Sequence, residues 1–515
     1  MASAAKRRKN EDGTVPSAQL TMHFDLENKN SDCELGMFLK WCGDMGIDVN
    51  HKVSLWQSCS KHHHHPVKCH CHTQVRDGKE GSCSRYGMVA TVDIAEGETL
   101  FAIPRDALLH PGNCSISSLL QQGEIELRSG SGWVPLVVCL MYEYTQANSK
   151  WRPYLDLCPD YSQLDSPMFW DKETVTSELK GTGVPDLVDR DVENIRHEYH
   201  SIAVPFMEKN PEYFDLSIHT LDLYRKLVAF VMAYSFSAPK KTSDSPQEDG
   251  EDDENDEEDE DIDDDEDEAG TTLTMMVPMA DILNHVAKNN ARLQFGQTRL
   301  SMVATKDIKK DEEVFNTYGE LPNWQLLQMY GFVEQYPENI YDTVDLPLTH
   351  VKDQSGCGVD GEHAQSKWDY LKETEEILDD SIVISCDGIL NKWETYRILK
   401  ILSMTPAEFK KHQESCANDD GLEEEEEDDE IEDNLEELFS FDGLSALPAA
   451  WRQLLTECAN KHLKSYKNTM DEDIKLVQME ESGPSTLNSR QRYACYLRIG
   501  QRKLLEKVVQ FCRIK

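Results

Sequence analysis

The pattern of apolar and polar positions is most informative in the second half of the chain. Met276 to Ile282 form a mostly apolar run that leads directly into the polar pair Asn284 and His285. Apolar runs then flank the charged segment 309–312, a pattern that predicts a β-hairpin over residues 300–315. For either polar residue alone, capping a strand is the simpler interpretation, but the chain turns back just after both of them.

A short polar turn and an aromatic helix complete this stretch. Asn316 to Gly319 read Asn-Thr-Tyr-Gly and follow the predicted hairpin at once. An apolar face at helical spacing comes next, formed by Trp324, Leu327, Met329, Tyr330 and Phe332. Residues 276–332 therefore predict a strand, a hairpin, a polar turn and a helix, in that order.

An earlier hairpin pattern repeats this one. Tyr86 to Pro104 predict two strands around the turn 95–97. When the chain is shifted by 214 residues, eight of the fourteen positions from Met88 to Phe101 are identical to those at 302–315. Shared β-propensity does not account for so many identities, so two related β-units are expected to flank the residues between them.

Helical periodicity predicts most of the remaining elements. A short amphipathic helix is expected over 35–46, and helices at 133–144, 191–206 and 218–236 form an insertion between the two β-units. The pattern turns helical again after Leu346, with further helices over 465–477 and 490–512. Thr405 to Glu408 read Thr-Pro-Ala-Glu, a capping box with proline at the first helical position.

The last predicted helix is strongly basic. Its cationic residues are Arg490, Arg492, Arg498, Arg502, Lys503 and Lys507. We expect them to form the solvated face of the helix, with an acidic partner surface as the alternative.

The charge of the chain is concentrated in two tracts. The 515 residues carry a net charge of −44, but 18 of the 21 residues from Glu248 to Glu268 are acidic, as are 14 between Asp419 and Glu437. Without these two tracts the net charge is −12, which is ordinary for a globular enzyme. The first tract is too charged to bury apolar surface and is expected to be a solvated loop.

The remaining composition limits the compartment and the class of protein. Fifteen cysteines are scattered without a secretory context and are expected to be reduced thiols. No apolar run approaches the roughly 20 residues that a membrane span needs. Lys6 to Lys9 form a basic cluster of the nuclear-import type within a polar N-terminal arm.

Residues 61–72 read KHHHHPVKCHCH and contain the side chains that zinc prefers. Cys69 and Cys71 lack a second, distant pair that would close a structural site. The segment is therefore interpreted as a His-rich surface loop, and no metal site is predicted.

The sequence Ile-Leu-Asn-His at 282–285, the hairpin and the Asn-Thr-Tyr-Gly turn together resemble the C-terminal half of a SET domain. Trp-Arg-Pro-Tyr at 151–154, the helical insertion and the C-terminal helices are similar to the Rubisco large-subunit methyltransferase-like class. This resemblance implies an α+β fold in which a β-rich SET domain with a threaded C-terminal segment is split by a helical insert. An all-α C-terminal domain follows.

The predicted organisation follows these boundaries. They are a disordered arm over 1–34, the first SET half with its N-terminal helix over 35–104, the helical insert over 105–241, an acidic loop over 242–270, the second SET half over 271–345, and a helical substrate-binding domain over 346–515 with an acidic loop at 417–437.

By the same resemblance, Tyr318 is the tyrosine at the active centre and S-adenosyl-L-methionine is the cofactor. The residues implied to bind the cofactor are Ser84, Arg85, Tyr86, Gly87, Tyr234, Asn284, His285 and Tyr330, and those implied to line the lysine channel are Trp133, Ser235, Ser237 and Phe332. Core packing is the alternative for Trp133, Tyr234, Tyr330 and Phe332.

The resemblance implies a protein-lysine N-methyltransferase, and we expect it to monomethylate nuclear proteins, including transcription regulators. The expected location is the nucleus, with the cytoplasm as a second possible location. The acidic tracts suggest contact with histones, whereas no direct contact with nucleic acid or membrane is expected. Histidine methylation and a catalytically silent chromatin adaptor are the alternatives. The chain has no Gly-x-Gly-x-x-Gly after a strand, no Walker A run and no His-Glu-x-x-His helix, which removes the commonest rival enzyme classes.

Overall fold

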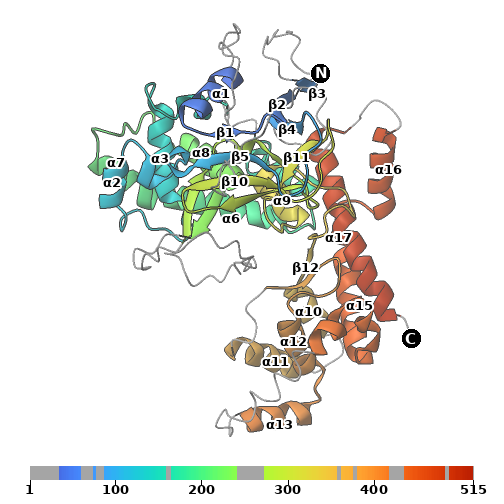
Figure 1. The fold of residues 1–515 in the computed structure, drawn as a ribbon. Coiled ribbons are helices and arrows are strands. Elements are labelled where there is room, and N and C mark those ends of the chain that lie inside the picture. The colour runs from blue at the N-terminus through green and yellow to red at the C-terminus, as the bar shows by residue number, and fades with distance from the viewer. Residues whose placement is uncertain are drawn as a thin grey trace, which may run out of the picture.

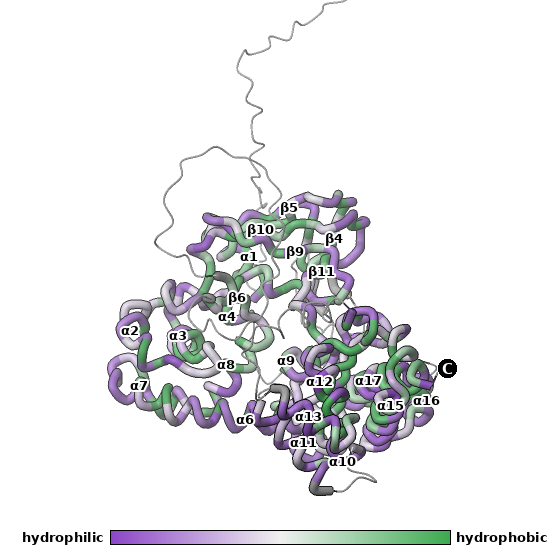
Figure 2. The backbone as a smooth tube through the Cα atoms, turned by 90° about the horizontal axis from the view of Figure 1, so that it is seen from below, coloured by the Kyte–Doolittle hydropathy of each residue, from purple (hydrophilic) through white to green (hydrophobic). Residues whose placement is uncertain are grey.

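The computed structural model describes residues 34–58, 74–76, 86–157, 164–239, 272–355, 361–374, 380–416, 434–481 and 487–513. Helices and strands form an upper body that contains the β-sheets and a lower body of C-terminal helices (Figure 1). A view turned by 90° separates the insert helices from the C-terminal helices, with helix α9 (Asn323–Tyr330) near the centre (Figure 2). The α+β class predicted from the sequence is confirmed.

Two sheets, one antiparallel and one mixed, form the centre of the upper body. Their strands are β1 (Asp48–Val49), β2 (Val53–Ser58), β3 (Gln74–Arg76), β4 (Tyr86–Ala90), β5 (Thr99–Pro104), β8 (Asn284–His285), β9 (Ala291–Phe295), β10 (Arg299–Ala304) and β11 (Glu313–Asn316). One sheet has the order β1-β5-β10-β9 and the other the order β3-β2-β4-β11-β8. Strands β6 (Ser235–Pro239) and β7 (Thr272–Met276) form a separate antiparallel pair.

All four predicted strands exist, but the prediction that they pair as two local hairpins is wrong. Strand β4 pairs with β11, and β5 pairs with β10, so each strand binds the other copy of the repeat. The connections also meet, because Ile94 and Ile308 form an antiparallel bridge. The connections 91–98 and 305–312 are longer than the two to five residues of a usual hairpin loop, so each unit arches from one sheet to the other.

The three helices predicted in the insert exist with shifted ends, but the insert contains further helices that the periodicity did not predict. Its main helices are α2 (Ser117–Gln122), α3 (Val134–Thr145), α4 (Arg152–Leu155), α5 (Lys172–Glu178), α6 (Val184–Glu198), α7 (Val204–Lys209) and α8 (Leu221–Tyr234). The predicted helix over 191–206 is divided by a π-helical turn, η5 (Tyr199–Ala203). Thr220 caps α8 by accepting a hydrogen bond from the Leu223 N–H at 3.3 Å.

One hydrophobic core joins this insert to the sheets. Helix α1 (Glu34–Asp44), which the sequence predicts over 35–46, buries Phe38 and Trp41 in that core. Helix α3 is buried along most of its length and packs against α8. The insert is therefore an integral part of the SET body.

The lower body has its own hydrophobic core. It contains β12 (Val344–Pro347), β13 (Ser381–Ile384), α10 (Leu348–Ser355), α11 (Gly361–Glu373), α12 (Lys392–Ser403), α13 (Pro406–Cys416) and α15 (Ala449–Leu463). Helix α16 (Met470–Glu481) lies beside the upper body instead (Figure 1). The predicted capping box is confirmed, since the Thr405 N–H donates to Glu408 Oε2 at 2.7 Å and the Glu408 N–H to Thr405 Oγ1 at 3.3 Å.

Helix α17 (Ser489–Arg513) belongs to both bodies. Ala494, Tyr496 and Leu497 pack in a small core with residues of the insert and α9, while Leu504 and Val508 pack in the lower body. Figure 1 shows this helix running along both bodies. At the junction, a Cβ on Gly500 would lie 2.6 Å from Asp342 Oδ2, so glycine permits this close approach.

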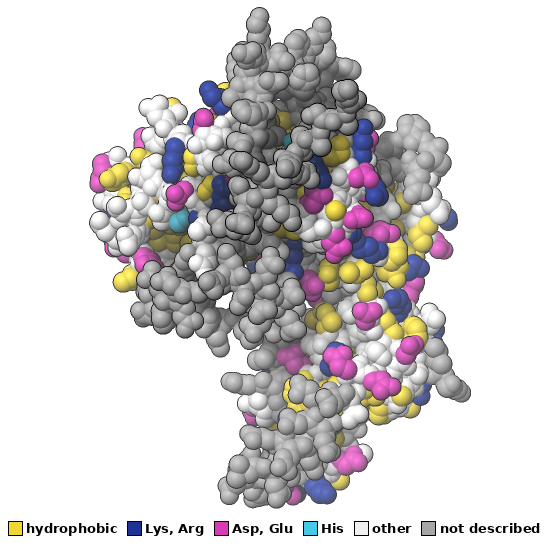
Figure 3. Space-filling model, viewed as in Figure 1, with side chains coloured by type: hydrophobic (Ala, Val, Ile, Leu, Met, Phe, Trp, Pro, Cys, Tyr) yellow, Lys and Arg dark blue, Asp and Glu magenta, His cyan; other side chains and the backbone are white. Residues whose placement is uncertain are grey.

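The predicted solvated basic face of this helix is wrong. Arg498 and Arg502 are 0% and 3% exposed. Arg490 forms an ion pair with Asp165, and Lys507 donates to the carbonyl oxygen of Cys386. On the face seen in Figure 3, acidic and basic side chains are interspersed over the lower body. Arg498 and Arg502 are buried because they bind carboxylate and carbonyl acceptors inside the protein, which helical periodicity cannot reveal.

Several predicted features lie outside the described residues. They are the basic cluster 6–9, the His-rich segment 61–72, Ser84, Arg85, the tract 248–268 and most of the tract 419–437. Across the described ranges, no helix is both long and apolar enough to cross a membrane. The same part of the chain has no group of three His, Cys, Asp or Glu side chains that could hold a metal ion.

A buried histidine in the lower body should make that body sensitive to acid. Burial, together with the neighbouring His350, lowers the pKa of His462 to about 4. This value lies below the unfolded value near 6.5, so the folded chain loses stability relative to the unfolded chain as the pH falls from about 6.5 towards 4. As the pH falls over this window, we expect the free energy of unfolding of His462→Phe to rise relative to that of the wild type, by at most about 1.4 kcal/mol per pH unit.

Urea unfolding of both proteins at pH 7.5, 6.0 and 5.0 measures this difference. The carboxyl of Asp342, whose pKa burial raises to about 6, has the opposite pH dependence. It is common to both proteins, so the difference between them isolates His462. A difference in free energy of unfolding that stays constant with pH would contradict the prediction.

Candidate active site

Strand β11 lies between β4 and β8 and brings the two segments singled out in the sequence side by side. It runs antiparallel to β4 and parallel to β8, with Phe315 opposite Asn284 and Asn316 opposite His285. A one-turn 3-10 helix, η6 (Ala280–Ile282), redirects the chain from β7 into β8. Met279 starts this turn with a φ of 84°, a conformation that favours glycine and that is often retained at functional sites.

Asn284 is held by a buried carboxylate that the sequence analysis did not identify. Its amide nitrogen donates to Glu313 Oε1 at 2.7 Å and to the Tyr86 carbonyl oxygen at 3.5 Å. Asn284 and Glu313 are 3% and 6% exposed. The side-chain oxygen Oδ1 of Asn284 is buried and has no hydrogen-bond partner within the described part of the chain, so an acceptor is available at this point.

Tyr318 is fixed at both its main chain and its hydroxyl group. Its N–H donates to His285 Nδ1 at 3.0 Å, and its hydroxyl donates to the Leu283 carbonyl oxygen at 3.0 Å. Both partners belong to the segment around β8. The catalytic candidate is therefore held by the residues that lead into and follow Asn284.

An aromatic cluster surrounds Tyr318. Its ring stacks on Tyr330 with centroids 4.6 Å apart and on His285 with centroids 5.1 Å apart. Phe332 meets Tyr318 edge-on at 6.4 Å and is 2% exposed. Such a cluster offers an apolar wall next to a phenol oxygen.

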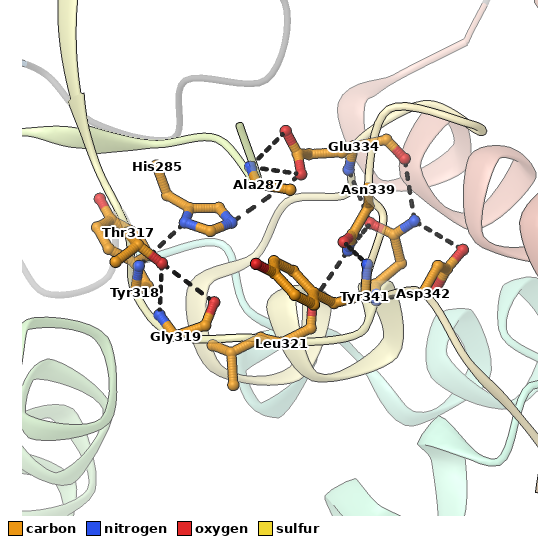
Figure 4. A network of polar contacts seen from close by, with 11 residues as sticks. His285, Ala287, Thr317, Tyr318, Gly319, Leu321, Glu334, Asn339, Tyr341 and Asp342 are labelled. Carbon is orange, nitrogen blue, oxygen red and sulfur yellow. Dashed lines mark hydrogen bonds and ion pairs between the residues drawn. The ribbon is translucent and has the colours of Figure 1, made fainter. Parts of the chain in front are cut away.

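Burial keeps the imidazole neutral at this site. It lowers the pKa of His285 to about 4 and raises the pKa of Glu334, whose carboxylate lies 4.0 Å from His285 Nε2. Since Nδ1 accepts from Tyr318, the proton of the neutral ring is on Nε2. Figure 4 shows this ring between Tyr318 and Glu334.

The structure places the other predicted residues around or away from this cluster. Tyr86 and Gly87 lie on β4, next to Asn284, and Gly87 packs so closely on the Trp56 ring that a Cβ would clash. Tyr234, Ser235 and Ser237 lie at the end of α8 and in β6, which pairs with the strand that leads into η6. Helix α8 contacts α9, the helix that carries Tyr330.

Trp133 has a different environment. It precedes α3, and its indole N–H donates to Glu198 of α6 at 3.1 Å. Its contacts thus lie within the helical insert, which favours a packing role over a place beside Tyr318.

Sequence reasoning missed the polar residues that support the cluster. Asn290 receives the Phe315 N–H at 2.7 Å and donates to the Glu313 carbonyl oxygen at 2.9 Å, which ties β11 in place. Asn323 and Asp342 are both 0% exposed and hydrogen-bonded to each other. Nothing in the local sequence distinguishes Glu313 from the exposed charges of the preceding turn.

Two family models match this chain. The model described as SET domain matches residues 85–319, and the model described as Rubisco LSMT substrate-binding matches residues 360–505. A protein named N-lysine methyltransferase setd6 from Salmo salar is 41% identical, over 95% of this chain and 98% of its own length. The chain belongs to the SET-domain N-lysine methyltransferases.

Further relatives and structures agree with this assignment. N-lysine methyltransferase SETD6 from Homo sapiens is 36% identical over 92% of this chain and 94% of its own length. The SET domain of LSMT bound to MeLysine and AdoHcy has a TM-score of 0.59 at 18% identity, covering 93% of this chain and 91% of that chain. At this identity the structural match shows the shared fold alone, and that fold is the one that the resemblance implied.

Proposed function

We propose that this enzyme transfers one methyl group from S-adenosyl-L-methionine to the side-chain amine of lysine residues in nuclear proteins. The observation that carries the proposal is the fixed hydroxyl group of Tyr318 within the aromatic cluster. Its proton is directed to the Leu283 carbonyl oxygen, so the phenol oxygen can accept a hydrogen bond from an incoming amine. An amine buried against the aromatic cluster beside it would more readily be in the neutral form that the reaction requires.

The residues of the site fit the cofactor. The buried Oδ1 of Asn284, which has no hydrogen-bond partner, is an acceptor of the kind that the ammonium of the cofactor's methionine end needs. Tyr86, Gly87, His285, Tyr234 and Tyr330 would hold the remainder, as the family resemblance implies. When bound, the cofactor supplies an electrophilic methyl group.

The chain's own residues supply alignment. Hydrogen bonds fix Tyr318 at two points, and the rings of Tyr330 and Phe332 pack against its ring. Holding two reacting groups in line accounts for several kcal/mol of a reaction barrier in general. No nucleophilic side chain is required for such a direct displacement.

Nuclear substrates are supported by the basic cluster 6–9 and by the acidic tracts, whose charge is complementary to that of histones. Transcription regulators and histones are the substrate classes we propose. Monomethylation is part of the same proposal.

Mass spectrometry of nuclear extract incubated with this protein and isotopically labelled cofactor tests the function. We expect labelled monomethyl-lysine in a limited set of proteins. Label on histidine would support the alternative that some members of the wider class suggest, and di- or trimethyl-lysine would overturn the monomethyl product. No label above that of a Tyr318→Phe control would contradict catalysis.

Asn284→Ala should weaken cofactor binding without abolishing it. Removing one side of a buried polar contact costs about 1–3 kcal/mol, which corresponds to roughly tenfold to a hundredfold in affinity. Calorimetric titration with S-adenosyl-L-methionine measures the change, and circular dichroism checks the fold. High cofactor concentration should restore part of the methylation rate. A folded Asn284→Ala protein with wild-type affinity would show that Asn284 is purely structural.

A further inference from the structure

Two N–H groups of one short segment converge on the carboxylate of Glu334. The Ala287 N–H donates to both carboxylate oxygens, at 3.1 and 3.3 Å. His285 Nε2 lies 4.0 Å from Oε2 of the same group. Figure 4 shows both contacts from one side of the imidazole, with Tyr318 on the other side.

The imidazole of His285 connects Glu334 to the catalytic tyrosine. Its side chain is 1% exposed, and Nδ1 accepts the Tyr318 N–H, so Nε2 carries the ring proton. Nε2 has no hydrogen-bond partner among the residues that the structure describes, and the carboxylate of Glu334 faces it at 4.0 Å. A buried N–H group directed at a carboxylate favours that tautomer over the one with the proton on Nδ1.

The main chain of Glu334 is held by a second layer of buried polar groups. Its N–H donates to Asn323 Oδ1 at 2.9 Å, and Asn323 Nδ2 donates to the Glu334 carbonyl oxygen at 3.1 Å. Asp342 in turn accepts from the Asn323 N–H at 3.0 Å and from Nδ2 at 2.9 Å. These hydrogen bonds fix the main chain of Glu334, and its side chain, which is 12% exposed, points away from them towards His285.

We propose that Glu334 is a positioning residue for methyl transfer. It keeps Nδ1 of the His285 ring unprotonated, so that this nitrogen can accept the Tyr318 N–H and fix the main chain of Tyr318. The inference rests on the proposed function and adds a residue that touches neither reacting atom. If Glu334 only accepted the hydrogen bond from the Ala287 N–H, the tautomer of His285 would not depend on it. The proposal requires that the tautomer does depend on Glu334.

The pair of donors explains why a carboxylate is needed here. An ionised carboxylate has only acceptors, so it can serve both the Ala287 N–H and the His285 Nε2–H. Glutamine has nearly the same shape but must turn its NH₂ group towards one of these two donors. Glu334→Gln therefore disturbs the imidazole with little change in volume.

A matched control is available four residues along the chain. Glu338 pairs with Lys288 at 3.3 Å, and both side chains are more than half exposed. Glu338→Gln removes the same charge next to the same segment without touching the imidazole, so it should behave as wild type. Glu334→Asp keeps an acceptor-only group and should retain most of the effect of glutamate.

The test combines kinetics with the ¹⁵N NMR spectrum of the His285 ring, whose nitrogen shifts report which nitrogen is protonated. We expect kcat for Glu334→Gln to fall by about tenfold to a hundredfold, because small displacements of a reacting group cost rates of that order. The KM for the protein substrate should stay close to that of the wild type. The ring spectrum should change from the Nε2–H tautomer to a mixture, whereas Glu338→Gln changes neither quantity.

Several results would overturn the proposal. One is an Nδ1–H tautomer of His285 in the wild type, which needs no variant. Another is a Glu334→Gln protein with wild-type kcat. A third is a Glu334→Gln protein whose kcat and melting temperature both fall while its ring spectrum stays unchanged, which would indicate a loss of stability alone. The NMR measurement needs no methyl transfer, so a chain without the proposed activity would fail the methylation assay and leave the ring spectrum as a separate result.

Discussion

Tyr318→Phe should lower the rate of methyl transfer by about a hundredfold or more, while the affinity for S-adenosyl-L-methionine stays close to that of the wild type. The hydroxyl group is the part of the side chain that can orient the amine, and loss of alignment at a reacting centre costs rates of this order. The ring remains in its stacks on Tyr330 and His285, so the aromatic surface is unchanged. Single-turnover methylation of a lysine-containing substrate and calorimetric titration measure the two quantities.

Tyr199→Phe is a matched control for this variant. Its hydroxyl also donates to a main-chain carbonyl oxygen, that of His219, at 2.8 Å, but in the helical insert. Each variant loses one hydrogen bond, worth about 1 kcal/mol of stability. Comparable melting temperatures with a rate loss in Tyr318→Phe alone would separate catalysis from stability. Full activity in Tyr318→Phe would show that the assignment of Tyr318 is wrong.

The Asn284–His285 pair and Tyr318 could be singled out in the sequence because each lies in a short motif, and those motifs carry the resemblance to SET domains that implies their roles. The apolar run before Asn284 and the glycine after Tyr318 are short-range signals, and the structure brings both segments together in one strand pairing. The capping box at Thr405 and the helix at 35–46 are local in the same sense. These elements depend on contacts within a few residues of one another.

The supporting residues could not be found in this way. Glu313 and Asn284 are 29 residues apart, and Glu334 and His285 are 49 apart, so their contacts exist only once the strands have paired. The swapped pairing of the two repeats is likewise a long-range choice. Identical strand patterns in both copies permit a local hairpin or an exchange, and the length of the connections decides between them.

The basic helix at the C-terminus shows the same limit for charge. A row of arginines at helical spacing predicts a solvated face unless buried acceptors exist elsewhere. Here they do, in Asp473 of α16 and in the carbonyl oxygen of Glu178 at the end of α5. Arg498 therefore ties α17 both to α16 and to the helical insert, and its removal should have a large effect on stability.

Arg498→Leu should lower the free energy of unfolding by about 3–5 kcal/mol, because it removes the cation that is hydrogen-bonded to the buried carboxylate of Asp473 and leaves only the more distant Arg502, at 3.9 Å. Arg498 donates to both Asp473 oxygens, at 2.6 and 2.9 Å, and the two side chains are 1% and 0% exposed. Urea unfolding monitored by circular dichroism measures the loss. Lys172→Ala, which removes an exposed ion pair with Asp189 at 3.2 Å, should change stability by no more than about 0.5 kcal/mol. An Arg498→Leu protein as stable as this surface control would show that the buried pair with Asp473 contributes little to stability.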